Sequence, residues 1–260
     1  MSDYTNLQLE IEGHTALVTL TNPSANTFTR DGLMALTQLV HDLNARRDVV
    51  SLVITGQGEK FFSAGADLKQ FADGDKAMAR EMARRFGEAF EALSQFRGVS
   101  IAAINGYAMG GGLECALACD IRIAESQAQM ALPEASVGLL PCAGGTQNLA
   151  WLVGEGWAKR MVLLGERINA DTALRIGLIE EITKTGEARA RALELAKMTD
   201  KQSPTSIAAC KKLIQGARHA PLAHMLPLER EAFIDLFDSY DQQEGVNAFL
   251  QKRPARWSNA

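Results

Sequence analysis

The sequence predicts an α/β core followed by a helical C-terminal region. The chain has 260 residues, of which 47% are hydrophobic, and this is enough to bury one large core. Strand-like apolar segments alternate with amphipathic helical segments through the first half, and after about Leu140 only helical patterns remain. Strands with crossovers followed by helices are typical of this fold class. We place a soft boundary so that residues 1–200 form the core and residues 201–260 the helical region.

The predicted strands begin with a pair, Leu7–Glu12 and Thr15–Leu20, which flank a turn at Gly13 and His14. The next strand is expected to be buried and is bounded by glycines at positions 56 and 58. It and the later short strands are Ser51–Thr55, Ile101–Ile104, Ile121–Ala124 and Gln129–Ala131.

The predicted helices follow from apolar residues spaced three and four positions apart. Asp31–Asn44 carries one such stripe, and a second helix carries Met82, Phe86, Phe90 and Leu93. Beyond Leu140 we predict seven helices, namely Thr146–Val153, Gly154–Leu164, Ala170–Ile176, Gly186–Met198, Ser203–Gly216, Pro221–Phe237 and Glu244–Gln251.

Composition excludes several classes of protein. The net charge of −4 argues against a nucleic-acid partner, and no apolar run approaches the roughly 20 residues of a membrane helix. The start of the chain lacks the basic and apolar stretches of a signal peptide. We therefore expect a cytoplasmic protein without a membrane span.

The cysteines and glycine motifs give no sign of a metal or nucleotide site. Cys115, Cys119, Cys142 and Cys210 form no CxxC pair, so we interpret them as buried small apolar residues in a reducing compartment and expect no metal. Gly56–Gly58 resembles half of a dinucleotide fingerprint, but the third glycine is absent.

The most informative run is Asn105–Glu114, in which three consecutive glycines separate a predicted strand from a helix. Glycines allow the backbone to approach a ligand closely, and a helix start offers free N–H groups. Such a turn can hold a negative oxygen. The carboxylate of Glu114 would stand beside it, which suggests proton chemistry on a carbonyl compound.

Two further runs are candidates for the same site. In 62–69 the small side chains before Asp67 would let a backbone N–H reach a ligand, although, taken alone, the run is more simply explained as a tight strand-to-helix turn with Asp67 as a first-turn acid. In 131–147 Pro133 ends a strand, so Glu134 projects from the strand end. A surface or salt-bridged acid is the alternative for Glu134, and a close packing turn is the alternative for the glycines at 144 and 145.

These three runs together resemble the enoyl-CoA hydratase/isomerase, or crotonase, superfamily. They read FSAGADLK at 62–69, NGYAMGGGLE at 105–114 and LPEASVGLLPCAGGTQ at 132–147. Weaker similarity covers most of the chain. The resemblance implies a core of ββα units wound into a spiral, with C-terminal helices that mediate a homotrimer or a homohexamer.

The resemblance also implies an acyl-CoA thioester ligand, with coenzyme A as part of the substrate and no other cofactor. The backbone N–H groups of Ala66 and Gly111 would bind the thioester oxygen, and Glu114 and Glu134 would be the catalytic acids. Two nearby carboxylates should not both ionise easily, so one pKa should rise. Further contacts to the substrate fall on Ala64, Asp67, Leu68, Lys69 and Gly110.

Having both glutamates favours hydration of a 2-trans-enoyl-CoA, as in fatty-acid β-oxidation, over the alternatives. These are a double-bond isomerase of the same superfamily and a CoA- or RNA-binding scaffold on the same fold. Cys142 stands where many hydratases have glycine, so its thiol either fills space or narrows the pocket.

Overall fold

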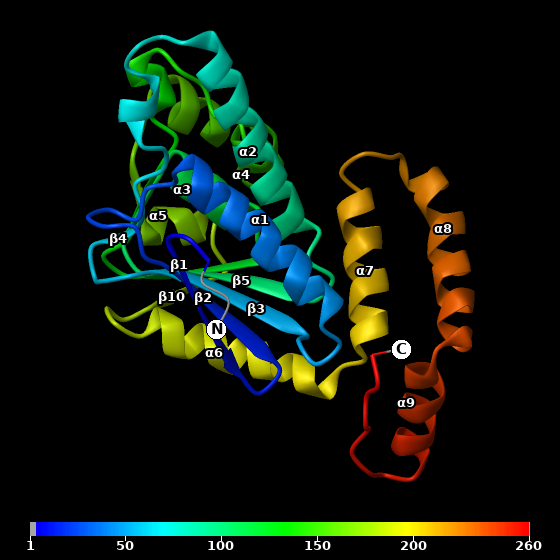
Figure 1. The fold of residues 1–260 in the computed structure, drawn as a ribbon. Coiled ribbons are helices and arrows are strands. Elements are labelled where there is room, and N and C mark those ends of the chain that lie inside the picture. The colour runs from blue at the N-terminus through cyan, green and yellow to red at the C-terminus, as the bar shows by residue number, and fades with distance from the viewer. Residues whose placement is uncertain (1–3, 260) are drawn as a thin grey trace.

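A six-stranded sheet forms the centre of the molecule (Figure 1). The computed structural model describes residues 4–259. In spatial order the sheet contains β1 (Leu7–Glu12), β2 (Thr15–Leu20), β3 (Ser51–Gly56), β5 (Val99–Ile104), β7 (Ile121–Glu125) and β10 (Glu181–Thr183). β1 runs antiparallel to β2, and all the other neighbours are parallel. The predicted α/β class is therefore confirmed.

A second sheet consists of short strands that each follow a long strand. It contains β4 (Phe61–Ser63), β6 (Tyr107–Met109), β8 (Gln129–Ala131) and β9 (Ile168–Asn169). Three times in succession, a strand of the large sheet leads to a strand of the small sheet and then to a helix. These helices are α2 (Lys76–Ser94), α3 (Gly111–Leu117) and α4 (Gly145–Leu163). This repeat is the ββα spiral that the resemblance implied.

Helices cover both faces of the large sheet, as the alternation of side chains along its strands requires. On β3, Leu52 and Ile54 belong to the core cluster beneath α1 (Arg30–Ala45) and α2. Val53 faces the other way, where the alanines of α6 (Ala188–Lys197) pack. The helices predicted from the stripes in 31–44 and 82–93 are confirmed as α1 and α2.

The prediction that strands end near Leu140 is wrong, because β9 and β10 lie beyond it. β9 pairs with β8, and β10 pairs with β7. The sequence prediction also omitted β4 and β6 as strands. All four have two or three residues, which is too short for a visible period of two. The two helices predicted to meet at Gly154 are confirmed as the two parts of α4, since Gly154 has a non-helical backbone there.

The C-terminal helices lie to one side of the sheets (Figure 1). They are α7 (Pro204–Gly216), α8 (Leu222–Asp235) and α9 (Tyr240–Leu250), joined by short turns that include η4 (Leu236–Asp238). The other elements after β8 are η2 (Glu134–Val137), α5 (Ala170–Arg175) and η3 (Met198–Lys201). The boundary placed near residue 200 stays a prediction.

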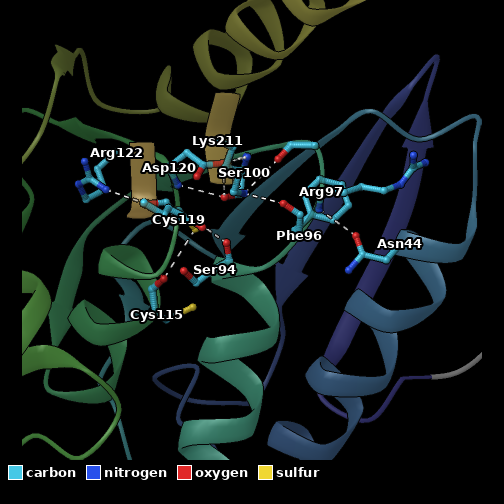
Figure 2. Close-up of polar contacts among 12 residues, drawn as sticks. Asn44, Ser94, Phe96, Arg97, Ser100, Cys115, Cys119, Asp120, Arg122 and Lys211 are labelled. Atoms are coloured by element: carbon cyan, nitrogen blue, oxygen red, sulfur yellow. Dashed lines mark hydrogen bonds and ion pairs between the residues drawn. The ribbon is translucent and has the colours of Figure 1, made fainter. Parts of the chain in front are cut away.

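A partly buried ion pair connects α7 to the core (Figure 2). Lys211 Nζ lies 2.7 Å from Asp120 Oδ2 and also donates to the carbonyl oxygen of Phe96 at 2.6 Å. The same oxygen of Asp120 accepts from the backbone N–H of Ser100 at 2.8 Å. The first helix of the C-terminal region is therefore held by specific polar contacts. None of the helices described in residues 4–259 combines the length and apolarity needed to cross a bilayer.

Candidate active site

One cleft collects residues from all three sequence motifs. It has a volume of about 180 Å³. Seven of the predicted site residues line it, namely Ala64, Ala66, Leu68, Gly110, Gly111, Glu114 and Glu134. They come from the turn after β4, the junction of β6 and α3, and η2 after β8. Parallel strands of the small sheet bring these connections to the same edge, which is where ligands bind in α/β proteins.

The segments that carry Ala66 and Gly111 lie against each other. Gly65, the residue before Ala66, has φ of 87°. A Cβ on Gly65 would lie 2.6 Å from the carbonyl oxygen of Met109 and 2.9 Å from the nitrogen of Gly111. Glycine is thus required both by the backbone angle and by the close approach. This contact sets the amide of Gly111 within reach of the turn that contains Ala66.

The amide groups of Ala66 and Gly111 are both free of protein acceptors among residues 4–259. Phe28 forms an isolated parallel β-bridge with Ala66. The N–H of Phe28 donates to the carbonyl oxygen of Gly65, and the carbonyl oxygen of Phe28 accepts from the N–H of Asp67. Successive amides of an extended segment point to opposite sides, so the N–H of Ala66 points away from Phe28. Both residues line the cleft, so the two unpaired donors belong to residues that border one space.

Glu114 is held at the beginning of a helix. Its side chain is buried, and Oε1 accepts from the N–H of Ala143 at 2.8 Å and from the N–H of Gly145 at 2.9 Å. Gly145 is the first residue of α4, so the carboxylate also lies at the positive end of that helix. Burial raises the pKa of Glu114, and the two N–H bonds oppose the rise.

Glu134 lies in the same cleft without comparable support. It begins η2, three residues after β8 ends, rather than projecting from the strand itself. Its Oε2 is buried and has no hydrogen-bond partner in the described part of the chain. Burial, together with the charge of Glu114, raises the pKa of Glu134 to about 7. The two carboxyl groups therefore differ, because Glu114 has two donors that favour its ionised form and Glu134 has an orphaned oxygen.

The predicted substrate contacts Asp67 and Lys69 are not among the described residues that line the cleft. Asp67 instead accepts from the N–H of Lys69 at 3.2 Å and caps η1 (Leu68–Phe71). The alternative interpretation of Asp67, an acid at the start of a helical turn, therefore describes its contacts. A contact of either side chain with coenzyme A stays a prediction.

The cysteines fall into two groups. Cys115 and Cys119 are buried, as predicted. Cys142 and Cys210 are exposed, so the prediction that they are buried is wrong. Cys142 precedes the residue that donates to Glu114 and lines the cleft, whereas Cys210 lies on α7.

The residues that donate to Glu114, and most of the apolar residues that line the cleft, were not predicted from the sequence. The glycine pair at 144 and 145 was noted, but its amide contact with Glu114 joins residues 31 positions apart, which no local pattern reveals. The rest of the wall is mostly apolar and consists of Phe71, Phe86, Met109, Pro133, Ser136, Val137, Leu139, Leu140 and Cys142.

A sequence model of the family described as enoyl-CoA hydratase/isomerase matches residues 10–260. A short-chain-enoyl-CoA hydratase of Clostridium acetobutylicum is 36% identical over 249 residues, which cover 95% of each chain. A 2,3-dehydroadipyl-CoA hydratase of Escherichia coli is 39% identical over 91% of this chain and 92% of its own.

Solved structures show the same relationship. The fold matches Pseudomonas aeruginosa DspI with a TM-score of 0.96 at 67% identity, over 99% of this chain and 98% of that one. It matches an enoyl-CoA hydratase from Bacillus anthracis with a TM-score of 0.94 at 32% identity, over 98% and 100% of the two chains. The chain belongs to the enoyl-CoA hydratase/isomerase family.

Proposed function

We propose that this protein hydrates 2-trans-enoyl-CoA thioesters to 3-hydroxyacyl-CoA in the cleft described above. The observation that carries the proposal is the meeting of two unpaired amides and two carboxyl groups of unlike environment in one largely apolar space. Hydration needs both kinds of group, since charge develops on the thioester oxygen while protons move at C2 and at the attacking water.

The amides of Ala66 and Gly111 form the oxyanion hole. When water adds to C3, the electrons of the C2–C3 double bond move toward the carbonyl and place negative charge on its oxygen. Two fixed donors stabilise that charge where it develops, and loss of one such donor typically lowers the rate by about 10²–10³. The contact between Gly65 and the Gly111 amide keeps the two donors together.

The two glutamates divide the proton transfers. Glu134, which retains a proton near neutral pH because its pKa is about 7, donates to C2. Glu114, whose Oε1 is anchored by two amides, uses the other oxygen to hold the water and accept its proton. Glu114 then releases its proton to solvent and Glu134 takes one up, which restores both residues to their starting protonation states.

The substrate supplies coenzyme A, and the reaction proposed here uses protein groups alone. Besides the oxyanion hole, the residues proposed to contact the substrate are Ala64, Leu68 and Gly110 in the cleft. Asp67 and Lys69, in the adjoining turn, are proposed to contact the coenzyme.

The assay is the loss of conjugated-thioester absorbance from crotonyl-CoA. Glu114→Gln and Glu134→Gln should each lower kcat by about 10² or more while binding is retained. Glu59→Gln, at an exposed acid outside the cleft, is the matched control and should hydrate at the parent rate. Parent-like rates in both cleft variants would refute the assignment. Faster conversion of 3-enoyl-CoA to 2-enoyl-CoA than hydration would instead identify an isomerase.

We also infer that the C-terminal helices assemble the protein into a homotrimer, two of which stack into a homohexamer. α8 contributes no buried residue within one chain. Large apolar side chains are exposed on or beside α8 and α9, namely Leu222, Leu226, Leu228, Phe233, Ile234, Phe237, Tyr240, Val246, Phe249 and Leu250. Such a surface is typical of a subunit interface.

Light scattering after size-exclusion chromatography tests the assembly. The parent should run as a trimer or hexamer, and Phe233→Asp should shift it toward smaller species. A monomeric parent would contradict the inference. A cytoplasmic location and a role in fatty-acid β-oxidation complete the proposed function.

A further inference from the structure

Cys142 occupies a special place in the cleft because it belongs to the loop that holds Glu114. The next residue, Ala143, donates its N–H to Glu114 Oε1 at 2.8 Å, and Gly145 donates to the same oxygen. The Cys142 side chain is exposed and lines the cleft that also contains Glu134. The thiol therefore borders the same cleft as the carboxylate proposed to hold the water.

The thiol and both acids line the same cleft. The cleft walls shield the exposed thiol in part from solvent, which raises the pKa of Cys142 to about 11, and the charges of Glu114 and Glu134 raise it further. A side chain that lines the cleft together with both carboxyl groups borders the space for the carbons on which those groups would act. The water attacks C3, so C3 is the substrate atom expected to lie nearest the loop 141–145.

We propose that the Cys142 side chain determines specificity by excluding acyl groups that carry a branch at C3. The inference rests on the proposed function, because that function sets C3 between Glu114 and Glu134. A straight chain presents a single hydrogen on C3 of the 2-enoyl group, whereas a branched chain presents a methyl group that would compete with the thiol for the same space. One methyl group too many or too few in an apolar pocket changes discrimination by about 10- to 200-fold.

The thiol acts here as a filler and not as a nucleophile. A 2-enoyl thioester is electrophilic at C3, and a thiolate close to it would add to that carbon. The thiolate is the reactive form of cysteine, and with a pKa of about 11 only about one molecule in 10⁴ carries it at pH 7. Partial shielding from solvent, together with the charges of the two acids, thus allows a thiol to remain beside the electrophile.

Binding of saturated thioesters tests the proposal without requiring catalysis. The dissociation constants of butanoyl-CoA and 3-methylbutanoyl-CoA are measured by calorimetry for the parent, Cys142→Gly and Cys142→Val, after thermal melts establish that each variant is folded. The parent should bind the branched thioester at least about 10-fold more weakly than the straight one. Glycine should bring the ratio to within about two-fold, and valine should increase it.

Two controls separate size from chemistry. Cys142→Ser is close to cysteine in size and should leave the ratio near the parent value. Cys210→Ser removes the other exposed thiol, which lies on α7 outside the cleft, and should not change the ratio.

Equal binding of the two thioesters by the parent, or a ratio unchanged by glycine, would overturn the inference. Hydration of crotonyl-CoA is followed on the same preparations. Absence of hydration by the parent would refute the proposed function, while the binding ratio would still report whether Cys142 excludes the branch.

Discussion

Replacement of Glu134 by glutamine should change the pH dependence of stability in a calculable way. The pKa of Glu134 rises from 4.5 to about 7, chiefly through burial. A carboxyl group with a higher pKa in the folded chain binds more protons there than in the unfolded chain, so the free energy of unfolding falls as pH rises between the two values. The difference between the two pKa values is equivalent to about 3 kcal/mol in full. Because solvent reaches part of the side chain and part of the change is already complete at pH 5, roughly 2 kcal/mol remains between pH 5 and pH 8.5.

Glutamine has nearly the same shape and does not titrate. The free energy of unfolding of Glu134→Gln, relative to the parent, should therefore rise by roughly 2 kcal/mol between pH 5 and pH 8.5. Urea unfolding at the two pH values and one protein concentration measures this difference. Glu59→Gln, at an exposed carboxyl outside the cleft, is the control. A difference between variant and parent that is equal at both pH values would refute the reasoning.

Three further predictions concern catalysis and packing. The kcat/KM for hydration of crotonyl-CoA should fall as pH rises through about 7, because Glu134 then loses the proton it gives to C2, and a flat profile from pH 6 to pH 9 would contradict this. Gly110 has φ of 53°, and Gly110→Ala would place a Cβ 3.0 Å from Glu134 Oε1. This variant should lower kcat at least about 10-fold. Gly13→Ala is the control, because Gly13 also has a positive φ but has open space around it, and it should lower only the free energy of unfolding, by about 1 kcal/mol. Lys211→Met leaves the partly buried carboxylate of Asp120 without its cation and should lower the free energy of unfolding, measured in urea, by about 3 kcal/mol. Lys212→Met replaces an exposed lysine and should leave that free energy unchanged.

Features with a long enough local pattern could be predicted from the sequence. The stripe in 31–44 extends over several turns and is confirmed as α1. The glycine-rich run before Glu114 indicated a tight turn into a helix, and α3 begins within it at Gly111. Short strands were predicted unevenly: β8 was found, whereas β4, β6, β9 and β10 were missed, since two or three residues contain no full alternation to guide the prediction.

The exposure of Cys142 was not predictable either. Free cysteines are usually buried, and only the family resemblance, which placed Cys142 at the pocket, separated it from Cys115. The difference arises because Cys115 lies on a helix packed inside the core, whereas Cys142 lies in the loop before α4 that borders the cleft.

The sequence by itself determined the family and seven of the residues that line the cleft, because both are carried by short motifs whose residue types are specific. Only the tertiary structure decided how the two acids differ. The donors to Glu114 come from Ala143 and Gly145, 29 and 31 positions away, and the orphaned oxygen of Glu134 is a property of its burial. A pKa depends on the solvent and dipoles around a group, and these are set by packing between segments that are distant along the chain.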